Sequence, residues 1–119
     1  MMEHKLIIGK RQTGKTELLI KESAKKQIPI ICATQNMAKY AENRAKELGL
    51  DIPKPVAAKY AAIDAELRKY NSVLVDDAAI VLNQLLGKHI EAMAINTGHE
   101  ALEPIEVIYT EEVKNDSAE

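Results

Sequence analysis

The feature of this sequence that most constrains its fold is the segment Gly-Lys-Arg-Gln-Thr-Gly-Lys-Thr at residues 9–16. It matches the pattern G-x-x-x-x-G-K-[ST], in which four variable residues lie between two glycines and a lysine and a hydroxyl residue follow. Average residue usage gives such a match by chance in about one of every few hundred chains of this length. The apolar run 5–8 before it is typical of a strand, and residues 17–22 after it favour a helix. The segment therefore predicts a strand, a tight loop and a helix in succession.

The residue types of this phosphate loop (residues 9–16) suit a site for phosphate groups. Its two glycines permit turns that a side chain would block, so that backbone N–H groups point towards an anion. The helix that begins near Lys15 directs the positive end of its dipole at the same anion. Lys15 adds a mobile positive charge towards the β- and γ-phosphates, and the Thr16 hydroxyl is a hard oxygen ligand suited to Mg²⁺. We therefore predict that a nucleotide is bound by the whole loop, namely Gly9, Lys10, Arg11, Gln12, Thr13, Gly14, Lys15 and Thr16.

A second acidic element follows further along the chain, where residues 72–77 read Ser-Val-Leu-Val-Asp-Asp. A buried parallel strand is apolar throughout and brings its last residue to the carboxyl edge of the sheet, where the phosphate loop is also expected. We predict that Asp76 lies near the bound Mg²⁺ and holds it through water. Asp77 is expected to orient or polarise the attacking water. Alternatively, Asp77 simply caps the helix predicted over residues 78–86, because Asp is a favoured N-cap residue.

The phosphate loop and the Val-Asp-Asp segment together resemble the Walker A and Walker B motifs of the P-loop NTPase superfamily, over roughly residues 4–110. The run Cys32–Ala38 is similar to the segment after the second strand in superfamily 1 helicases, so the chain resembles a stripped-down first RecA-like domain. In length and layout it resembles more closely short P-loop proteins of phages and prophages of Gram-positive bacteria. The resemblance implies ATP and Mg²⁺ as ligands and Lys15 and Asp77 as catalytic residues. It also implies a role in phage DNA metabolism, with DNA, a DNA-processing protein or further copies of the chain as partners.

The chain departs from helicases because it has no room for a second RecA-like domain, which would contribute an arginine finger. Its arginines are Arg11, Arg44 and Arg68. Arg11 lies inside the phosphate loop and is placed to touch phosphate or a neighbouring subunit, whereas the other two lie on predicted helices and are most simply solvated. Asn96 or Thr97 is either a polar sensor near the γ-phosphate or part of a turn.

The hydrophobic pattern predicts an α/β fold, with a minimal three-layer P-loop NTPase domain over residues 1–110 and an acidic tail at 111–119. Strands are expected at 28–33, 72–77, near 90–95 and at 105–109. The last two are joined by a short connection without a helix, so we expect an antiparallel hairpin at one edge of a mostly parallel sheet. Helices are expected at 15–26, at 78–86, and along two stripes of helical spacing, which are Met37, Tyr40, Ala41, Arg44, Ala45 and Leu48, ending at Gly49, and Tyr60, Ile63, Leu67 and Tyr70.

Composition excludes several classes of protein. The 119 residues allow one domain, and no apolar run approaches the ~18 residues that a membrane span needs. The N-terminus lacks a signal-peptide layout and Cys32 is the one cysteine, so we expect the cytoplasm of a bacterial host. Net charge is −2, but residues 1–50 carry ten Lys and Arg against five Asp and Glu. That excess is either a positive rim around an anion site or a set of solvated helix faces.

Three functions remain open on these grounds. The first is a slow Mg²⁺-dependent ATPase, activated by a partner or by self-assembly. The second is a nucleotide-dependent binding module, in which ATP orders a docking surface and hydrolysis is incidental. The third is a small nucleoside or nucleotide kinase. It is disfavoured because we find no arginine-rich lid or acceptor pocket in the sequence, and because Cys32 alone cannot supply the zinc module of the thymidine kinases that residues 14–20 resemble.

Overall fold

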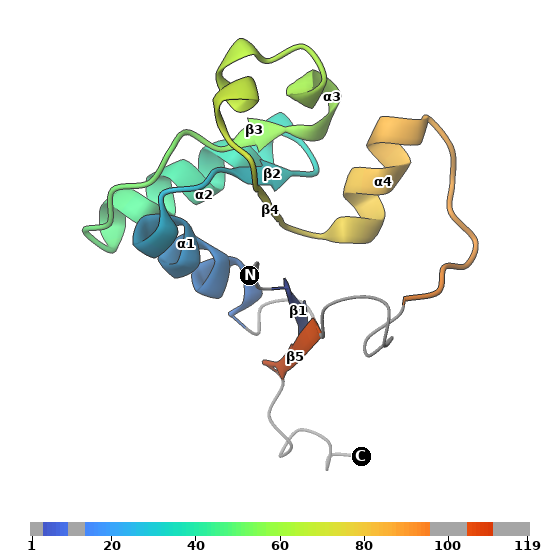
Figure 1. Cartoon of the computed structure of the whole chain (residues 1–119), viewed down its shortest axis with the longest axis horizontal. Coiled ribbons are helices and arrows are strands. Elements are labelled where there is room, and N and C mark those ends of the chain that lie inside the picture. Colours follow the sequence, from blue (N-terminus) through green and yellow to red (C-terminus); the bar gives the residue numbers. More distant parts are fainter. Residues whose placement is uncertain (1–3, 10–13, 96–104, 111–119) are drawn as a thin grey trace. The chain divides into compact units, whose positions relative to one another are not determined.

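The computed structural model describes residues 4–9, 14–95 and 105–110 (Figure 1). The described chain divides into two compact units, one containing residues 4–9, 14–15, 92–95 and 105–110 and the other containing residues 16–91. The predicted tail at 111–119 lies outside the described residues. All strand pairs in both units are parallel, so the architecture is α/β with parallel sheets.

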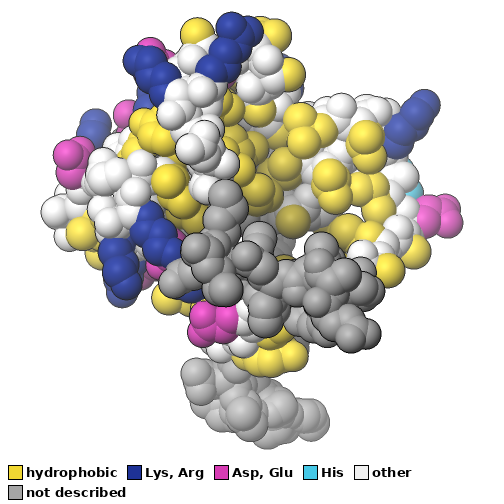
Figure 2. All heavy atoms as spheres, in the orientation of Figure 1, with side chains coloured by type: hydrophobic (Ala, Val, Ile, Leu, Met, Phe, Trp, Pro, Cys, Tyr) yellow, Lys and Arg dark blue, Asp and Glu magenta, His cyan; other side chains and the backbone are white. Residues whose placement is uncertain are grey.

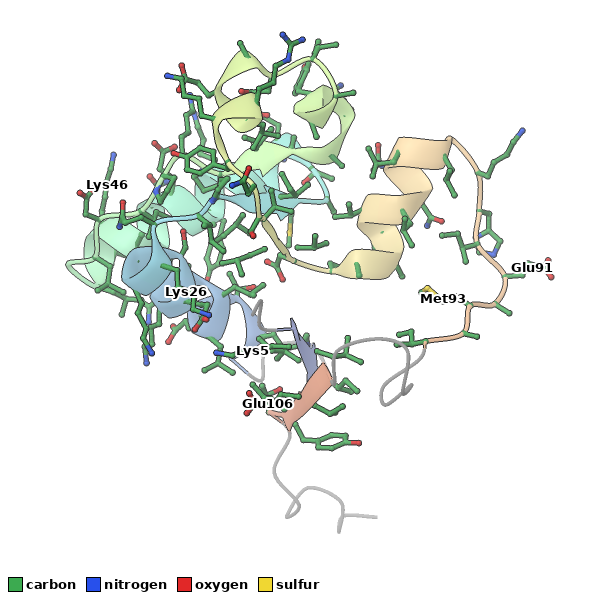
Figure 3. The ribbon with its side chains drawn as sticks, in the orientation of Figure 1. Lys5, Lys26, Lys46, Glu91, Met93 and Glu106 are labelled. Atoms are coloured by element: carbon green, nitrogen blue, oxygen red, sulfur yellow. The ribbon has the colours of Figure 1, made fainter. Side chains whose placement is uncertain are left out.

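The smaller unit contains a two-stranded sheet of β1 (His4–Ile8) and β5 (Ile105–Tyr109). The strands pair in register from His4 opposite Ile105 to Ile8 opposite Tyr109, which sets Lys5 opposite Glu106 (Figure 3). The predicted antiparallel hairpin is therefore wrong, because β5 runs parallel to β1 and residues 90–95 form no strand. Segment 90–95 reads Ile-Glu-Ala-Met-Ala-Ile, and its central residues are weak strand formers.

The larger unit is built on a three-stranded sheet in the order β3-β2-β4. The central strand β2 (Ile30–Cys32) is fully buried and lies between β3 (Val56–Ala57) and β4 (Leu74–Val75). Strands were predicted at the positions of β2 and β4, and the structure confirms both with shorter bounds. The sequence did not predict β3, because two residues after a proline-rich linker carry no periodicity.

Three helices of the structure coincide with predicted ones: α1 (Lys15–Lys26), α2 (Gln35–Glu47) and α4 (Ala78–Leu86). Thr34 caps α2, since its Oγ1 accepts a hydrogen bond from the N–H of Met37 over 3.2 Å. At the other end the N–H of Gly49 donates to Lys46 and that of Leu50 donates to Ala45. These two bonds form a Schellman motif, which explains why the predicted helix stop at Gly49 is confirmed.

The third predicted helix, over Tyr60, Ile63, Leu67 and Tyr70, is wrong. The structure has a one-turn α3 (Ala58–Ala61) and a 3-10 helix η1 (Ala65–Lys69) in its place. Asp64 separates them, because its Oδ1 accepts from the N–H groups of Glu66 and Leu67 and so starts a new turn. Tyr60 is 44% exposed and Ile63 73% exposed, whereas Leu67 packs against the core, so the four residues do not form one buried face.

The core of the larger unit is thin and aliphatic, in a chain that contains four Tyr and neither Phe nor Trp. On one face of the sheet Ile31 and Ala33 pack with Ala58 and Val81, which belong to α3 and α4. The alternate strand residues Ile30 and Cys32 point to the opposite face, because side chains alternate along a strand. The small residues of α2 that are buried, in place of the predicted Tyr40 (53% exposed), are Ala38, Ala41 and Ala45.

Helix α4 is apolar on more than one side. Val81 is buried, whereas Ile80, Leu82, Leu85 and Leu86 are exposed. Figure 2 shows hydrophobic side chains gathered over this helix. Among the residues described, no helix combines the length and the apolar character that crossing a bilayer requires.

Candidate functional site

The centre of the candidate site is a contact between Thr16 and Asp76. Thr16 lies in the first turn of α1, and its Oγ1 donates a hydrogen bond to Oδ2 of Asp76 over 2.9 Å. Asp76 directly follows β4, and its N–H donates to the carbonyl of Ile31 over 2.9 Å, so the pairing with β2 extends one residue beyond the strand. Its side chain is only 5% exposed. The sheet thus holds this carboxylate at its carboxyl edge, where the sequence predicted it.

The two oxygens of this contact suit a Mg²⁺ ion. Mg²⁺ takes six oxygen ligands at about 2.1 Å, so that neighbouring ligands of the octahedron lie about 3 Å apart. The 2.9 Å between Thr16 Oγ1 and Asp76 Oδ2 is an ordinary hydrogen-bond length that also equals this separation, so it fits direct binding by both oxygens and equally the predicted binding of Asp76 through water. The part of the chain that the structure describes contains no group of three or more His, Cys, Asp or Glu side chains able to hold a metal. An ion bound here would therefore complete its shell with water and phosphate oxygens, as Mg²⁺ commonly does.

Cys32 lies in the same interior as Asp76. It is fully buried in β2, and burial, together with the negative charge of Asp76, raises the pKa of its thiol to about 12. Since the thiolate is the form that attacks carbon or binds metal, the protonated Cys32 is a packing residue at neutral pH.

The end of the phosphate loop is described in the smaller unit. Gly14 has a φ of +92°, a conformation that side-chain-bearing residues rarely adopt, which supports the requirement for glycine there. The Nζ of Lys15 donates a hydrogen bond to the carbonyl of Gly9 over 2.7 Å. The remaining loop residues lie outside the described part of the chain, so their predicted contacts with phosphate stay predictions; they are Lys10, Arg11, Gln12 and Thr13.

Asp77 has an unusual backbone. Its φ and ψ are both 65°, in the left-handed region, and its side chain makes no capping hydrogen bond to α4. The alternative that Asp77 serves only as a side-chain cap is therefore not realised in this structure. Asp tolerates this conformation better than most residues, but the conformation still carries a cost. The result is an exposed carboxylate directly after the buried carboxylate of Asp76.

The prediction that Arg44 is merely solvated is wrong. Its Nε and Nη2 both donate to Oε2 of Glu17, over 2.8 and 2.5 Å, and its Nη1 donates to Oε1 of Glu47 over 2.9 Å. The spacing of Arg44 and Glu47 on one helix is visible in the sequence. The contact with Glu17 joins two helices 27 residues apart, and no local pattern predicts it. Arg68 is exposed on η1, as predicted, and Arg11 lies outside the described residues.

A separate hollow of about 550 Å³ opens beside β3. Two of its polar groups serve local structure, since Asp64 caps η1 and Glu66 pairs with Lys69 over 3.1 Å. None of the predicted site residues lines it. The lining residues are Pro29, Gln35, Pro53, Lys54, Pro55, Val56, Ala57, Tyr60, Asp64, Glu66, Leu67 and Tyr70.

Asn96 and Thr97, predicted as sensor or turn, lie outside the described residues. His89 is exposed and belongs to no metal-binding group among the described side chains.

Comparison of the chain with protein families, with curated proteins and with solved structures gave no match.

Proposed function

We propose that this protein binds ATP with Mg²⁺ and hydrolyses it slowly. The observation that carries the proposal is the hydrogen bond between Thr16 and Asp76. It joins the last residue of a phosphate-loop sequence to a buried carboxylate at the carboxyl edge of a parallel sheet. A chance match to the loop pattern would not require its hydroxyl to meet the acid that follows an apolar strand.

The roles of the residues follow from their chemistry. Thr16 and Asp76 would hold Mg²⁺, which when bound supplies positive charge that draws electron density from the phosphate oxygens. Lys15, which precedes Thr16 in the chain, would exchange its bond to the carbonyl of Gly9 for the β- and γ-phosphates. Gly14 supplies a backbone turn that favours N–H groups directed at an anion. The N-terminus of α1 adds its dipole.

Asp77 is the residue proposed to orient the water that attacks the γ-phosphate. Its exposed carboxylate, not used as a cap, supports this role. An arginine finger is worth roughly 10³–10⁵ in rate, so a domain without one turns over slowly. Of the two arginines in the described residues, Arg44 is engaged with two glutamates and Arg68 is on the surface of η1. Arg11 lies outside the described residues, and activation is proposed to come from a protein partner or from a second copy of the chain.

The engagement of Arg44 also favours a second candidate, the nucleotide-dependent binding module. In that function ATP and Mg²⁺ bind at the same residues, and the bound nucleotide changes the affinity for a partner without turnover. The two functions differ in one observable: the module releases no phosphate even at saturating DNA.

Calorimetric titration of ATP and ADP with Mg²⁺ into the wild type and Lys15→Ala, with phosphate release followed in the same samples, tests the proposal. Binding by the wild type, loss of binding in Lys15→Ala and slow phosphate release are expected. Binding without phosphate release at any DNA concentration would favour the binding module. A wild type that binds neither nucleotide would overturn both.

A further inference from the structure

We propose that Arg44 tunes the phosphate site by neutralising Glu17, so that the first turn of α1 accepts a polyphosphate. This inference rests on the proposed function, since it concerns the same nucleotide site. Arg44 does not touch the ligand in this account. It is a positioning residue that acts through the carboxylate of Glu17.

The geometry begins with the position of Glu17. It directly follows Thr16, so its Cα lies about 3.8 Å from that of the proposed Mg²⁺ ligand. A carboxylate in the first turn of a helix stabilises the helix itself, because its negative charge is attracted to the positive end of the helix dipole. The same negative charge is unfavourable for a helix end that must bind the several negative charges of ATP.

Arg44, which belongs to the neighbouring helix α2, neutralises the negative charge of Glu17. Two of its N–H groups converge on one oxygen of Glu17, and the third direction of its guanidinium is taken by Glu47. Arg44 is about one-third exposed, as is Glu17, so solvent screens the pair in part but does not abolish it. A guanidinium is always charged and its planar fork fits a carboxylate, which makes Arg the suited residue for a permanent neutralising contact.

The contact has a second consequence for the site. It ties α2 to the first turn of α1, next to the residue whose hydroxyl meets Asp76. Loss of Arg44 would leave the negative charge of Glu17 unpaired, next to the residue whose hydroxyl meets Asp76.

A double-mutant cycle tests the inference. MgATP and MgADP are titrated calorimetrically into four proteins: the wild type, Arg44→Ala, Glu17→Gln and the double variant. Arg44→Ala is expected to weaken MgATP binding on the order of tenfold, and MgADP binding less, because an unscreened charge acts more strongly on the more charged ligand. Glu17→Gln should bind at least as tightly as the wild type. The double variant should bind MgATP as tightly as Glu17→Gln, because Arg44 has no negative charge to neutralise at position 17 once that residue is Gln.

The dependence of MgATP affinity on salt concentration distinguishes an electrostatic role of Arg44 from a purely structural one. The difference between Arg44→Ala and the wild type should shrink as salt rises to about 0.5 M, since screening weakens the repulsion from Glu17. Glu47→Gln breaks the other half of the Arg44 contact and is the matched control, with unchanged binding expected. Arg44→Gln repeats the cycle if Arg44→Ala fails to fold.

Two results would overturn the inference while leaving the proposed function intact. One is MgATP binding by Arg44→Ala equal to that of the wild type. The other is a double variant as weak as Arg44→Ala, which would mean that Arg44 does not act through Glu17. Failure of the wild type itself to bind MgATP would instead overturn the proposed function, and the inference with it.

Discussion

The hydroxyl of Thr16 meets the carboxylate of Asp76 across 2.9 Å, although the two residues lie sixty positions apart in the sequence. One belongs to the first turn of α1 and the other follows β4. Their contact brings together two segments whose sequence patterns were interpreted separately. It also places a hydroxyl donor on a carboxylate that is almost fully removed from water.

This contact makes a prediction for the stability of the ligand-free protein. Thr16→Val keeps the shape of the side chain and removes the donor to a buried carboxylate, which should lower the free energy of unfolding by about 1–3 kcal/mol. Thr16→Ser retains the hydroxyl and is the matched control, with a smaller loss expected. Urea denaturation of the three proteins measures the difference. Equal midpoints for Thr16→Val and the wild type would show that the hydrogen bond contributes nothing.

Asp77→Asn should separate binding from hydrolysis. The substitution preserves the side-chain size and a residue type that tolerates the left-handed backbone, so the fold and MgATP affinity should stay at the wild-type level. Removal of the carboxylate should lower the rate of phosphate release by roughly 10²–10⁴, the usual contribution of a general base. Phosphate release at saturating ATP measures it. Hydrolysis at the wild-type rate would contradict the role given to Asp77.

The sequence predicted those parts of the fold that local signals specify. Helix α2 is capped by Thr34 at its start and is followed by Gly49 at its end. Helix α1 begins directly after Gly14, at the lysine of the loop pattern. The position of Asp76 after β4 was likewise predictable, because the segment that contains it is a contiguous pattern.

The errors of prediction arise where tertiary contacts override periodicity. The stripe over residues 60–70 has helical spacing, but α3 ends at Ala61, and the Asp64 side chain accepts from the backbone of Glu66 and Leu67 and starts a separate 3-10 helix. The partner of β5 lies about a hundred residues earlier in the chain, and nothing local distinguishes a parallel partner from a hairpin. Arg44 was missed as part of the site because its contact with Glu17 exists only once two helices have packed.

Gly49→Ala tests the helix stop that the sequence did specify. The φ of Gly49 is +72°, and an added Cβ would meet nothing within 4 Å, so the cost is conformational and not a clash. The left-handed conformation costs a non-glycine residue about 1–2 kcal/mol, and the free energy of unfolding should fall by that amount. Lys39→Ala, on the exposed side of the same helix, should change it by less than about 0.5 kcal/mol. Equal stability of Gly49→Ala and the wild type would contradict the assigned helix end.

Cys32 gives a prediction for pH. Its thiol pKa is raised from 9.0 to about 12, first by burial and second by Asp76. A raised pKa means that the folded protein holds the proton more tightly, so this contribution to stability is complete below pH 9 and is lost as pH rises towards 12. Cys32→Ala should therefore lose less stability than the wild type between pH 9 and pH 11 in urea titrations. Parallel pH profiles of the two proteins would contradict the buried, protonated thiol.

Lys15→Ala should abolish detectable binding of MgATP without a large effect on the fold. Lys15 donates to the carbonyl of Gly9, and the lysine is proposed to supply the charge that holds two phosphates. Lys21→Ala, on the exposed surface of the same helix, is the charge-matched control and should bind normally. If Lys15→Ala still binds MgATP, the phosphate loop is not the site that binds the nucleotide.

The most direct test of the central claim is the gain in ATP affinity that Mg²⁺ confers on the wild type and on Asp76→Asn. Calorimetric titrations of ATP in Mg²⁺ and in EDTA give that gain for each protein. If Thr16 and Asp76 hold the ion, the wild type should bind ATP at least about tenfold more tightly with Mg²⁺, and Asp76→Asn should lose most of this gain. An equal gain in both proteins, or no binding by the wild type in either buffer, would contradict the account.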